Sequence, residues 1–229
     1  MSRKKNAESM SSRVRRLARS AGVFHVRDAV AAGVHPEAVR RLWKAGELAR
    51  IGSGLYELEG YDVTEHHSLV EVARRVPRGV VCLLSALAFH DLTTQQPFEV
   101  WVAIDPKARL PKSEGVKLRM VRFSGPALTE GVESRVIEGT TVRVFSVAKT
   151  IADCFKYRYK VGLDVALEAL REGWRERRFT MDELWRHAEV CRVAKVMRPY
   201  LEMETFGGGR EVLGNGRVGN DEQPGAGLL

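Results

Sequence analysis

The sequence contains no apolar run long enough to cross a bilayer. Its longest nearly apolar stretch, residues 80–89, falls well short of the roughly 20 residues that a spanning helix requires. The first residues carry no apolar stretch either, so we expect no secretory signal. Cysteine is scarce: Cys82, Cys154 and Cys191 are an odd number without close spacing, which favours the reducing cytoplasm over a disulfide framework.

Positive charge is in excess, and most of the excess lies at one end of the chain. The 229 residues include 37 lysines and arginines against 29 acidic residues, for a formal net charge of +8. Residues 1–60 hold 12 of these basic residues and 6 of the acidic ones, whereas the other residues hold 25 and 23. Basic charge gathered at one end is typical of a module that binds a polyanion. A basic tail that merely aids solubility is the plainer alternative.

Composition divides the chain into four stretches. Residues 1–10 form a polar, basic arm that we expect to be disordered. Residues 11–60 are compact and mostly helical, and residues 61–204 mix strands and helices. Residues 205–229 contain eight glycines and few large apolar side chains, so we expect them to form a disordered tail.

The stretch from residue 11 to residue 60 predicts three short helices. Gly22 is placed to end the first of them. The apolar positions of that helix share one face: Val14, Leu17, Ala18 and Ala21. A second helix is expected over residues 27–32, with Ala29 and Val30 facing inward. The third begins at Pro36, a residue suited to the first helical turn because its missing N–H would be unpaired there.

The third helix presents two distinct faces. Its inward positions are Val39, Leu42 and Trp43. Its opposite face carries Glu37, Arg40, Arg41 and Lys44. Two short helices joined by a glycine-containing turn, the second with an arginine-rich face, are typical of a helix-turn-helix whose second helix enters the major groove of DNA. Arginine or lysine there can contact guanine, while an ordinary solvated helix face is the alternative explanation.

A hairpin follows this helix directly. Residues 48–58 predict two short strands around Gly52-Ser53-Gly54, whose glycines permit a positive φ. A hairpin after the recognition helix is the wing of a winged helix-turn-helix, and its residues are placed to reach phosphate or the minor groove. We therefore expect double-stranded DNA as a partner. The candidate DNA-binding residues are Arg13, Arg16, His35, Glu37, Arg40, Arg41, Lys44, Arg50 and Ser53.

The stretch after residue 60 predicts an α+β domain with a small antiparallel sheet and C-terminal helices. A buried helix is expected over residues 80–91. Alternating apolar residues predict half-buried strands at three places: Phe98 to Ile104, Val116 to Met120, and Val142 to Val144. Ser146 and Thr180 are placed to cap two of the helices that follow. The expected inward positions of these helices are Val147, Ile151 and Phe155; Leu163, Ala166, Leu167, Leu170 and Trp174; and Leu184, Ala188 and Cys191.

Two further patterns could indicate chemistry, and each has a plainer explanation. Ser146 and Lys149 have the Ser-x-x-Lys spacing of penicillin-binding enzymes, but the other motifs of that family are absent. His187 and Cys191 are spaced like two zinc ligands on a helix. No other ligand pair with metal-site spacing accompanies them, so we expect a buried cysteine and a surface histidine.

A nuclease guided by the winged helix is the main catalytic alternative. Glu99, Asp105 and Lys107 could form a carboxylate cluster of the nuclease kind. The dipeptide Asp105-Pro106 instead indicates a turn at the end of a strand. We therefore expect a protein that is not an enzyme and that holds neither a metal nor a cofactor.

Several stretches resemble the AbiEi antitoxins of the type IV abortive-infection toxin–antitoxin systems of bacteria. The pattern that runs from Gly33 to Gly46 and on to Tyr56 is similar to the winged-helix domain of that family. In the second domain the similar segments are Ser85 to Thr93, Val144 to Arg158, Glu168 to Leu170, and Arg198 to Tyr200. The likeness covers about residues 11–204 and leaves the glycine-rich tail outside.

This resemblance implies two functions. The N-terminal domain would bind repeats in its own promoter and repress the operon, and the second would counteract a nucleotidyltransferase-like toxin without requiring a stable complex. Basic residues are frequent between residues 156 and 200, and those at 175–178 are denser than stability requires. The expected toxin-countering surface is Arg158, Lys160, Arg171, Arg175, Arg177 and Arg178. A regulator with a ligand-sensing second domain and no toxin partner is the remaining alternative.

Overall fold

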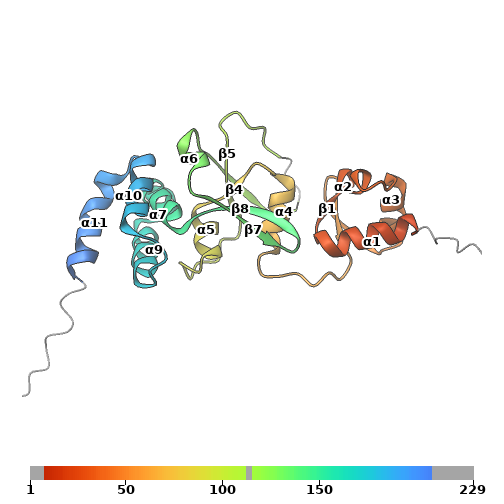
Figure 1. The fold of residues 1–229 in the computed structure, drawn as a ribbon, viewed down its shortest axis with the longest axis horizontal. Helices are drawn as coiled ribbons and strands as arrows, with labels where there is room; N and C mark the ends of the chain where they lie inside the picture. The colour runs from red at the N-terminus through yellow and green to blue at the C-terminus, as the bar shows by residue number, and fades with distance from the viewer. Residues whose placement is uncertain (1–7, 112–114, 208–229) are drawn as a thin grey trace, which may run out of the picture.

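The computed structural model describes residues 8–111 and 115–207. Its parts follow one another along the long axis of the molecule: an N-terminal domain, a central sheet with covering helices, and a layer of C-terminal helices (Figure 1). The predicted basic arm, residues 1–10, and the predicted tail, residues 205–229, fall mostly outside the described residues. Where they are described, Met10 begins the first helix and Gly207 ends the last one.

The N-terminal domain is a winged helix-turn-helix, as the sequence predicts. Its elements are α1 (Met10–Ala21), β1 (Phe24–His25), α2 (Val26–Ala31), α3 (Pro36–Lys44), β2 (Leu48–Gly52) and β3 (Leu55–Leu58). The strands form an antiparallel sheet in the order β1-β3-β2, so the hairpin of β2 and β3 is the wing. The sequence pattern does not predict β1, because two residues are too few to show the periodicity of a strand.

Capping residues fix where these short helices begin and end. Ser9 Oγ accepts a hydrogen bond from Ser12 N at 3.1 Å and so opens α1. Gly22, with a φ of 59°, ends α1 in a conformation that favours glycine, as predicted. His25 and Asp28 form a capping box at the start of α2. The helices enclose one apolar core. Its buried members include Val14, Ala18, Phe24, Val39 and Leu42.

Two inward positions predicted for this domain are wrong. Val30 is 49% exposed, because the short helix α2 buries only Ala29, and Phe24 of β1 supplies the large apolar side chain of this region. Trp43 is 39% exposed, and its ring meets Tyr56 edge-on at a centroid distance of 6.5 Å. Trp43 therefore lies at the edge of the core and not at its centre.

The second part of the chain contains a larger sheet and the remaining described helices. Its elements are α4 (His67–Arg75), β4 (Val80–Val81), α5 (Leu83–Phe89), β5 (Val100–Ile104), β6 (Leu118–Arg122), α6 (Pro126–Thr129), β7 (Val132–Ile137), β8 (Thr140–Phe145), α7 (Val147–Lys156), α8 (Arg158–Val161), α9 (Leu163–Arg175), α10 (Met181–Val190) and α11 (Ala194–Gly207). The α+β class is thereby confirmed. The sheet, in the order β6-β5-β4-β8-β7, is mixed: β4–β5 and β7–β8 pair antiparallel, whereas β4–β8 and β5–β6 pair parallel across long connections.

Helices cover both faces of this sheet. Trp101 of β5 points into a core shared with α5, α7, α9 and α10. Its neighbour Val102 points into a second cluster with α4, which Val23 and Leu55 of the N-terminal domain join. Because neither face meets solvent, all five residues of β5 are buried, whereas the sequence pattern predicts burial of alternate residues only.

Three boundaries around this sheet differ from the sequence prediction, and one is that of β6, which begins at Leu118 and not at Val116. Phe98, predicted as the first inward residue of the strand, is 82% exposed, and β5 begins two residues later. Val80 and Val81, predicted within a buried helix, form β4 instead. Val81 lies opposite both Val102 and Val144, so this dipeptide joins the two halves of the sheet. A short apolar run without periodicity does not distinguish a strand from a helix.

The C-terminal helices begin where the sequence predicts, since Ser146 caps α7 and Thr180 forms a capping box on α10. The buried face of α9 is rotated from the predicted one. Its fully buried residues are Val165, Ala166, Ala169, Leu170 and Gly173, whereas Leu163, Leu167 and Trp174 are only partly buried. A Cβ at Gly173 would lie 2.8 Å from Phe179 and 3.3 Å from Ile151 of α7. The small residues of α9 therefore decide which face approaches α7.

The turn between β7 and β8 fixes the N-terminal domain to the central sheet. A Cβ on Gly139 would lie 1.9 Å from Ser20 O at the end of α1, so only glycine permits this approach. Thr140 Oγ1 donates a hydrogen bond to Ala21 O at 3.2 Å. Arg74 of α4 donates to Thr140 Oγ1 at 3.0 Å and to Asp28 Oδ2 of α2 at 3.3 Å. Polar contacts thus surround the apolar contact made by Val23 and Leu55.

Candidate nucleic-acid interface

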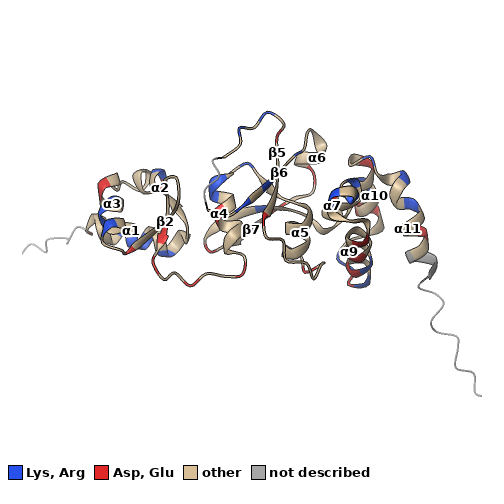
Figure 2. Ribbon diagram, turned by 180° about the vertical axis from the view of Figure 1, so that it is seen from behind, with Lys and Arg blue, Asp and Glu red and all other residues tan. Residues whose placement is uncertain are grey.

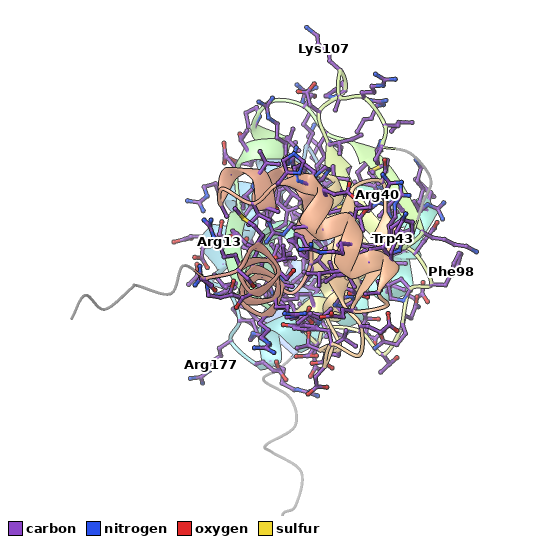
Figure 3. All side chains as sticks on the ribbon, turned by 90° about the vertical axis from the view of Figure 1, so that its right-hand side faces the viewer. Arg13, Arg40, Trp43, Phe98, Lys107 and Arg177 are labelled. Carbon is purple, nitrogen blue, oxygen red and sulfur yellow. The ribbon has the colours of Figure 1, made fainter. Side chains whose placement is uncertain are left out.

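The recognition helix α3 lies at the free end of the N-terminal domain, away from the central sheet (Figure 1). His35 Nδ1 accepts a hydrogen bond from Glu37 N at 3.2 Å, and Pro36 occupies the first turn, so the helix begins where the sequence predicts. Figure 2, the reverse view, shows basic residues on α1 and α3. Figure 3 looks onto this end of the molecule and shows Arg40 and Trp43 there. The helix is therefore open to a partner.

The polar face of α3 is exposed along its length. Its members Glu37, Arg40, Arg41 and Lys44 are all exposed. Arg40 and Glu37 form a loose ion pair at 3.8 Å with side chains 60% and 65% exposed. Surface pairs of this kind contribute about 0–1 kcal/mol, so Arg40 can readily exchange this partner for phosphate or guanine. Arg41 Nη2 donates one hydrogen bond to Ser11 Oγ at 2.9 Å, which is replaceable in the same way.

The two arginines predicted on α1 have different surroundings. Arg13 donates to the carbonyl oxygens of Ala32 and Gly33, the second at 3.3 Å, and so ties α1 to the turn of the helix-turn-helix. Arg16 pairs with Glu8 at 2.6 Å, and its side chain is 68% exposed. Arg13 therefore holds α3 in position, whereas Arg16 is accessible to a phosphate.

A second tie within the domain joins α1 to the wing. Arg15 Nε and Nη2 donate to the two oxygens of Glu47 at 2.7 and 2.9 Å. The hydrogen bond from Arg15 lowers the pKa of Glu47 and raises that of Arg15. Glu47 lies between α3 and β2, so this bidentate pair sets the angle at which the wing leaves the recognition helix. The sequence pattern gave no sign of it, because the two residues are far apart in the chain.

The wing presents a compact tip. Arg50 Nε donates to Gly52 O at 3.2 Å, so its guanidinium lies along the hairpin, and Ser53 is exposed at the turn. Gly54 has a φ of 72°, and a Cβ there would lie 2.8 Å from His25 Cε1. The wing therefore packs closely on the start of α2, and both predicted wing residues lie on the surface of the hairpin.

A basic cleft beside the wing was not predicted from the sequence. It has a volume of about 300 Å³, and its lining includes Arg27 of α2, Ser53 of the wing, and Arg74 and Arg75 of α4. Arg74 is held by Asp28 and Thr140, and Arg75 donates to Glu71 at 3.2 Å and to Val116 O at 2.7 Å. Arg27 is exposed. Among these arginines, Arg27 is thus the one placed to add to the nucleic-acid interface.

The basic residues predicted to counter a toxin form two separate groups. The first, on α8, is Arg158 and Lys160; the second, at and beyond the end of α9, is Arg175, Arg177 and Arg178. Because α9 has 13 residues, the groups are about 20 Å apart. Arg171 is exposed between them, and Figure 2 shows acidic as well as basic residues on α9. The six residues therefore do not make one continuous basic patch.

The carboxylates considered for a nuclease lie apart. Glu99 and Asp105 flank β5 at its two ends, about 20 Å from each other. Glu99 is paired with Arg119 at 2.7 Å, and Asp105 Oδ1 accepts a hydrogen bond from Lys107 N at 2.8 Å, as in the predicted turn. Within residues 8–111 and 115–207, no group of three histidine, cysteine or acidic side chains could hold a metal ion.

The other two chemical patterns also have structural roles. Ser146 Oγ accepts a hydrogen bond from Lys149 N at 3.4 Å, and Lys149 Nζ forms a buried ion pair with Asp153. Cys191 Sγ donates to Asp153 Oδ1 at 3.1 Å, and burial raises the pKa of its thiol to about 12. His187, predicted at the surface, is only 2% exposed, because α10 packs this side against α7. Throughout the described part of the chain, no helix has both the length and the apolarity needed to span a membrane.

Three helices, the third of them an exposed basic recognition helix, and a wing define the N-terminal domain as a winged helix-turn-helix of the DNA-binding class. Residues 12–58 match the family described as "Transcriptional regulator, AbiEi antitoxin", which confirms the predicted resemblance over this domain. A search of curated proteins finds no significant match. The crystal structure of the RV2827C protein from Mycobacterium tuberculosis is similar, with a TM-score of 0.54 and 18% identity over 79% of this chain and 71% of that one. At that identity, the likeness shows the fold alone.

Proposed function

We propose that the protein is a DNA-binding transcriptional autorepressor and an antitoxin that counters a nucleotidyltransferase-like toxin. The observation that carries the DNA-binding half is the exposed polar face of α3 at the free end of the molecule, together with the exposed wing residues Arg50 and Ser53. The family match of residues 12–58 supports both the regulatory half and the antitoxin half.

On DNA, α3 would enter the major groove with its polar face toward the bases. Arg40 and Arg41 can each make bidentate hydrogen bonds to guanine, and Glu37 can accept one from cytosine. Lys44, Arg50 and Ser53 would contact phosphate on either side of the groove, with Arg16 adding charge from α1. The contacts of Arg13 and of the Arg15–Glu47 pair would keep these groups in register. Binding at repeats in the promoter would repress transcription of the operon.

A gel-shift experiment with the DNA upstream of the gene tests this half. The double variant Arg40→Ala with Arg41→Ala should weaken binding by about ten-fold or more, because each guanine contact is worth about 1–3 kcal/mol. Arg192→Ala with Lys195→Ala removes the same charge from exposed positions at the other end of the chain and serves as the control. Affinity should also fall steeply with salt. Equal binding by wild type and by the α3 variant, with both folded by circular dichroism, would refute the role of α3.

Co-expression with the adjacent reading frame tests the antitoxin half. If that frame encodes a nucleotidyltransferase-like toxin, the protein should restore growth, and the α3 variant should still do so because neutralisation lies in the second part. Alanine substitution of either basic group would then locate the toxin-countering surface, because growth should no longer be restored. The groups are Arg158 with Lys160, and Arg175 with Arg177 and Arg178. A neighbouring frame of another class, or failure of the wild-type chain to restore growth, would contradict this half and leave the repressor intact.

A further inference from the structure

The second part of the chain contains a polar cavity far from α3. It has a volume of about 420 Å³ and lies between the start of β7, the N-terminus of α7 and the helix α10. This size falls in the range of sites for small molecules. Charged side chains from β7, from α10 and from the segment before α10 line it, including Arg135, Arg178 and Arg186.

Positive charge prevails in this cavity. Its two acidic residues are already engaged, since Glu183 accepts a hydrogen bond from Thr180 N at 2.9 Å and Glu133 pairs with Arg135 at 2.5 Å. Within the part of the chain that the structure describes, the ion-pair partner of Arg178 is Glu176, at 3.2 Å, whose side chain is 41% exposed. For Arg186, no ion pair forms within the described residues. Two guanidinium groups are therefore available to an anionic ligand.

The N-terminus of α7 adds backbone donors to the same wall. Val147 and Ala148, the first two residues of this ten-residue helix, line the cavity. The amides of a first helical turn have no partner inside the helix, and the helix dipole is positive at this end. Ser146 Oγ satisfies only the third amide, that of Lys149. Helix N-termini of this kind bind phosphate and other anions.

A buried histidine on the wall of the cavity supplies a second, independent observation. His187 lines the cavity and is 2% exposed, and its Nδ1 has no hydrogen-bond partner among the described residues. A Cβ on Gly131, whose φ is 69°, would lie 3.0 Å from His187 Cε1, so the chain packs tightly against the ring and holds it. Burial, together with Arg186 and Lys149, lowers the pKa of His187, so the ring is neutral near pH 7. A neutral imidazole can donate from Nδ1 to a bound anion.

From these contacts we infer that the cavity binds the phosphate group of a small phosphorylated molecule. Arg178 and Arg186 would neutralise the phosphate, the amides of Val147 and Ala148 would orient it, and His187 would donate one hydrogen bond. The cavity is larger than one phosphate, which leaves room for the group that carries it. This inference does not depend on the proposed repressor function, since the cavity shares no residue with α3 or the wing, but it shares Arg178 with the basic group proposed to counter the toxin.

Calorimetric titration of the full chain tests the inference with three probes: inorganic phosphate, pyrophosphate and a nucleoside 5′-monophosphate. We expect saturable binding that Arg178→Gln with Arg186→Gln weakens by about ten-fold or more, because charge-assisted hydrogen bonds are lost. The control Arg175→Gln with Arg177→Gln removes the same charge from nearby exposed positions outside the cavity. It should leave affinity within about two-fold, since neither side chain lines the cavity and the effect of charges outside it is screened by salt. The order of affinity among the three probes shows whether the part of the ligand that carries the phosphate contributes to binding.

A second measurement follows His187 itself by NMR of histidine-labelled protein. A bound phosphate should raise the pKa of His187 from its lowered value, because a nearby anion favours the imidazolium. The same titration with Arg178→Gln and Arg186→Gln should show a smaller rise. The inference is overturned if none of the probes binds saturably, if the control pair weakens binding as much as the cavity pair, or if the His187 titration is unchanged by ligand.

Discussion

His67 Nδ1 lies 2.8 Å from Glu138 Oε2 and so joins the start of α4 to the turn between β7 and β8. Its other ring nitrogen is 3.1 Å from Glu57 Oε2 in β3. Glu138 also accepts hydrogen bonds from Thr64 N and Oγ1 at 2.9 and 2.8 Å. One histidine thus stands between two carboxylates where the wing meets the central sheet.

The shifted pKa values of these two carboxyl groups lead us to expect that the stability of the fold depends on pH. Burial raises the pKa of Glu57. Burial also acts to raise the pKa of Glu138, but hydrogen bonds from Thr64 and His67 outweigh it and leave that pKa below its ordinary value. Glu138 should therefore stabilise the fold fully above the unfolded pKa of about 4.3 and lose this effect as the pH falls through its lowered pKa.

Urea unfolding of wild type and Glu138→Gln, followed from neutral to acid pH, checks this expectation. The loss caused by the substitution should be largest at neutral pH and should shrink as the carboxyl of the wild type becomes protonated. Glu59→Gln changes an exposed carboxyl nearby and should have little effect at any pH. A loss for Glu138→Gln that stays constant with pH would contradict the assignment.

Substitution of two glycines distinguishes the cost of backbone strain from the cost of a steric clash. Gly139 and Gly60 have nearly the same φ, 71° and 68°, so alanine is strained equally at both. A Cβ at Gly139 would strike Ser20 O, whereas at Gly60 it would meet no described atom within 4 Å. Gly139→Ala should lower the free energy of unfolding by about 2 kcal/mol more than Gly60→Ala, because the N-terminal domain must move away from the sheet. Equal losses in urea unfolding would show that this close approach contributes nothing.

The buried ion pair of α7 predicts a non-additive result. Lys149 and Asp153 are both 0% exposed, and Lys149 Nζ also lies 4.1 Å from the centre of the Phe145 ring. Asp153→Ala should lower the free energy of unfolding by about 3–5 kcal/mol, because an unpaired charge stays buried. Lys149→Met combined with Asp153→Leu should lose much less, since no charge remains. A double variant as unstable as the single one in urea would show that the volume of these side chains matters more than their charge.

Arg13 and Arg16 should differ although both lie on α1. Arg13→Ala removes the donor to Ala32 O and Gly33 O, so it should lower the unfolding free energy by about 1 kcal/mol and weaken DNA binding at all salt concentrations. Arg16→Ala removes only an exposed charge and should leave stability unchanged while reducing the salt dependence of binding. Thermal unfolding and gel shifts at several salt concentrations distinguish the two, and identical behaviour would refute the separation.

Local patterns in the sequence predicted α1, α2, α3, α5, α7, α9 and α10, whereas α4, α6, α8 and α11 were not predicted. The faces of α3 follow from spacing alone, and the caps at Ser146 and Thr180 require only neighbouring residues. The strands β1, β4 and β7 were not predicted. β1 and β4 have two residues each and owe their conformation to distant partners, Tyr56 for Phe24 and Val102 for Val81. Spacing within one element does not show such pairings.

The same distinction, between local patterns and contacts between distant residues, applies to the candidate sites. The exposed face of α3 was predictable because it is a property of one helix. The role of Arg13 was not, since it depends on carbonyl groups some twenty residues away that only the folded turn brings near. The burial of His187 was likewise hidden, because it results from the packing of α10 on α7 and from the positive φ of Gly131.

Leu55 of the wing and Val23 after α1 lie in the same apolar cluster as Val102 and Val144 of the central sheet. The N-terminal domain therefore cannot tilt relative to the central sheet without disrupting an apolar core that the two share. If the protein binds promoter repeats as proposed, each bound copy would hold its C-terminal helices in one fixed orientation relative to the DNA. The spacing and orientation of two half-sites would then dictate whether those helices meet or point apart.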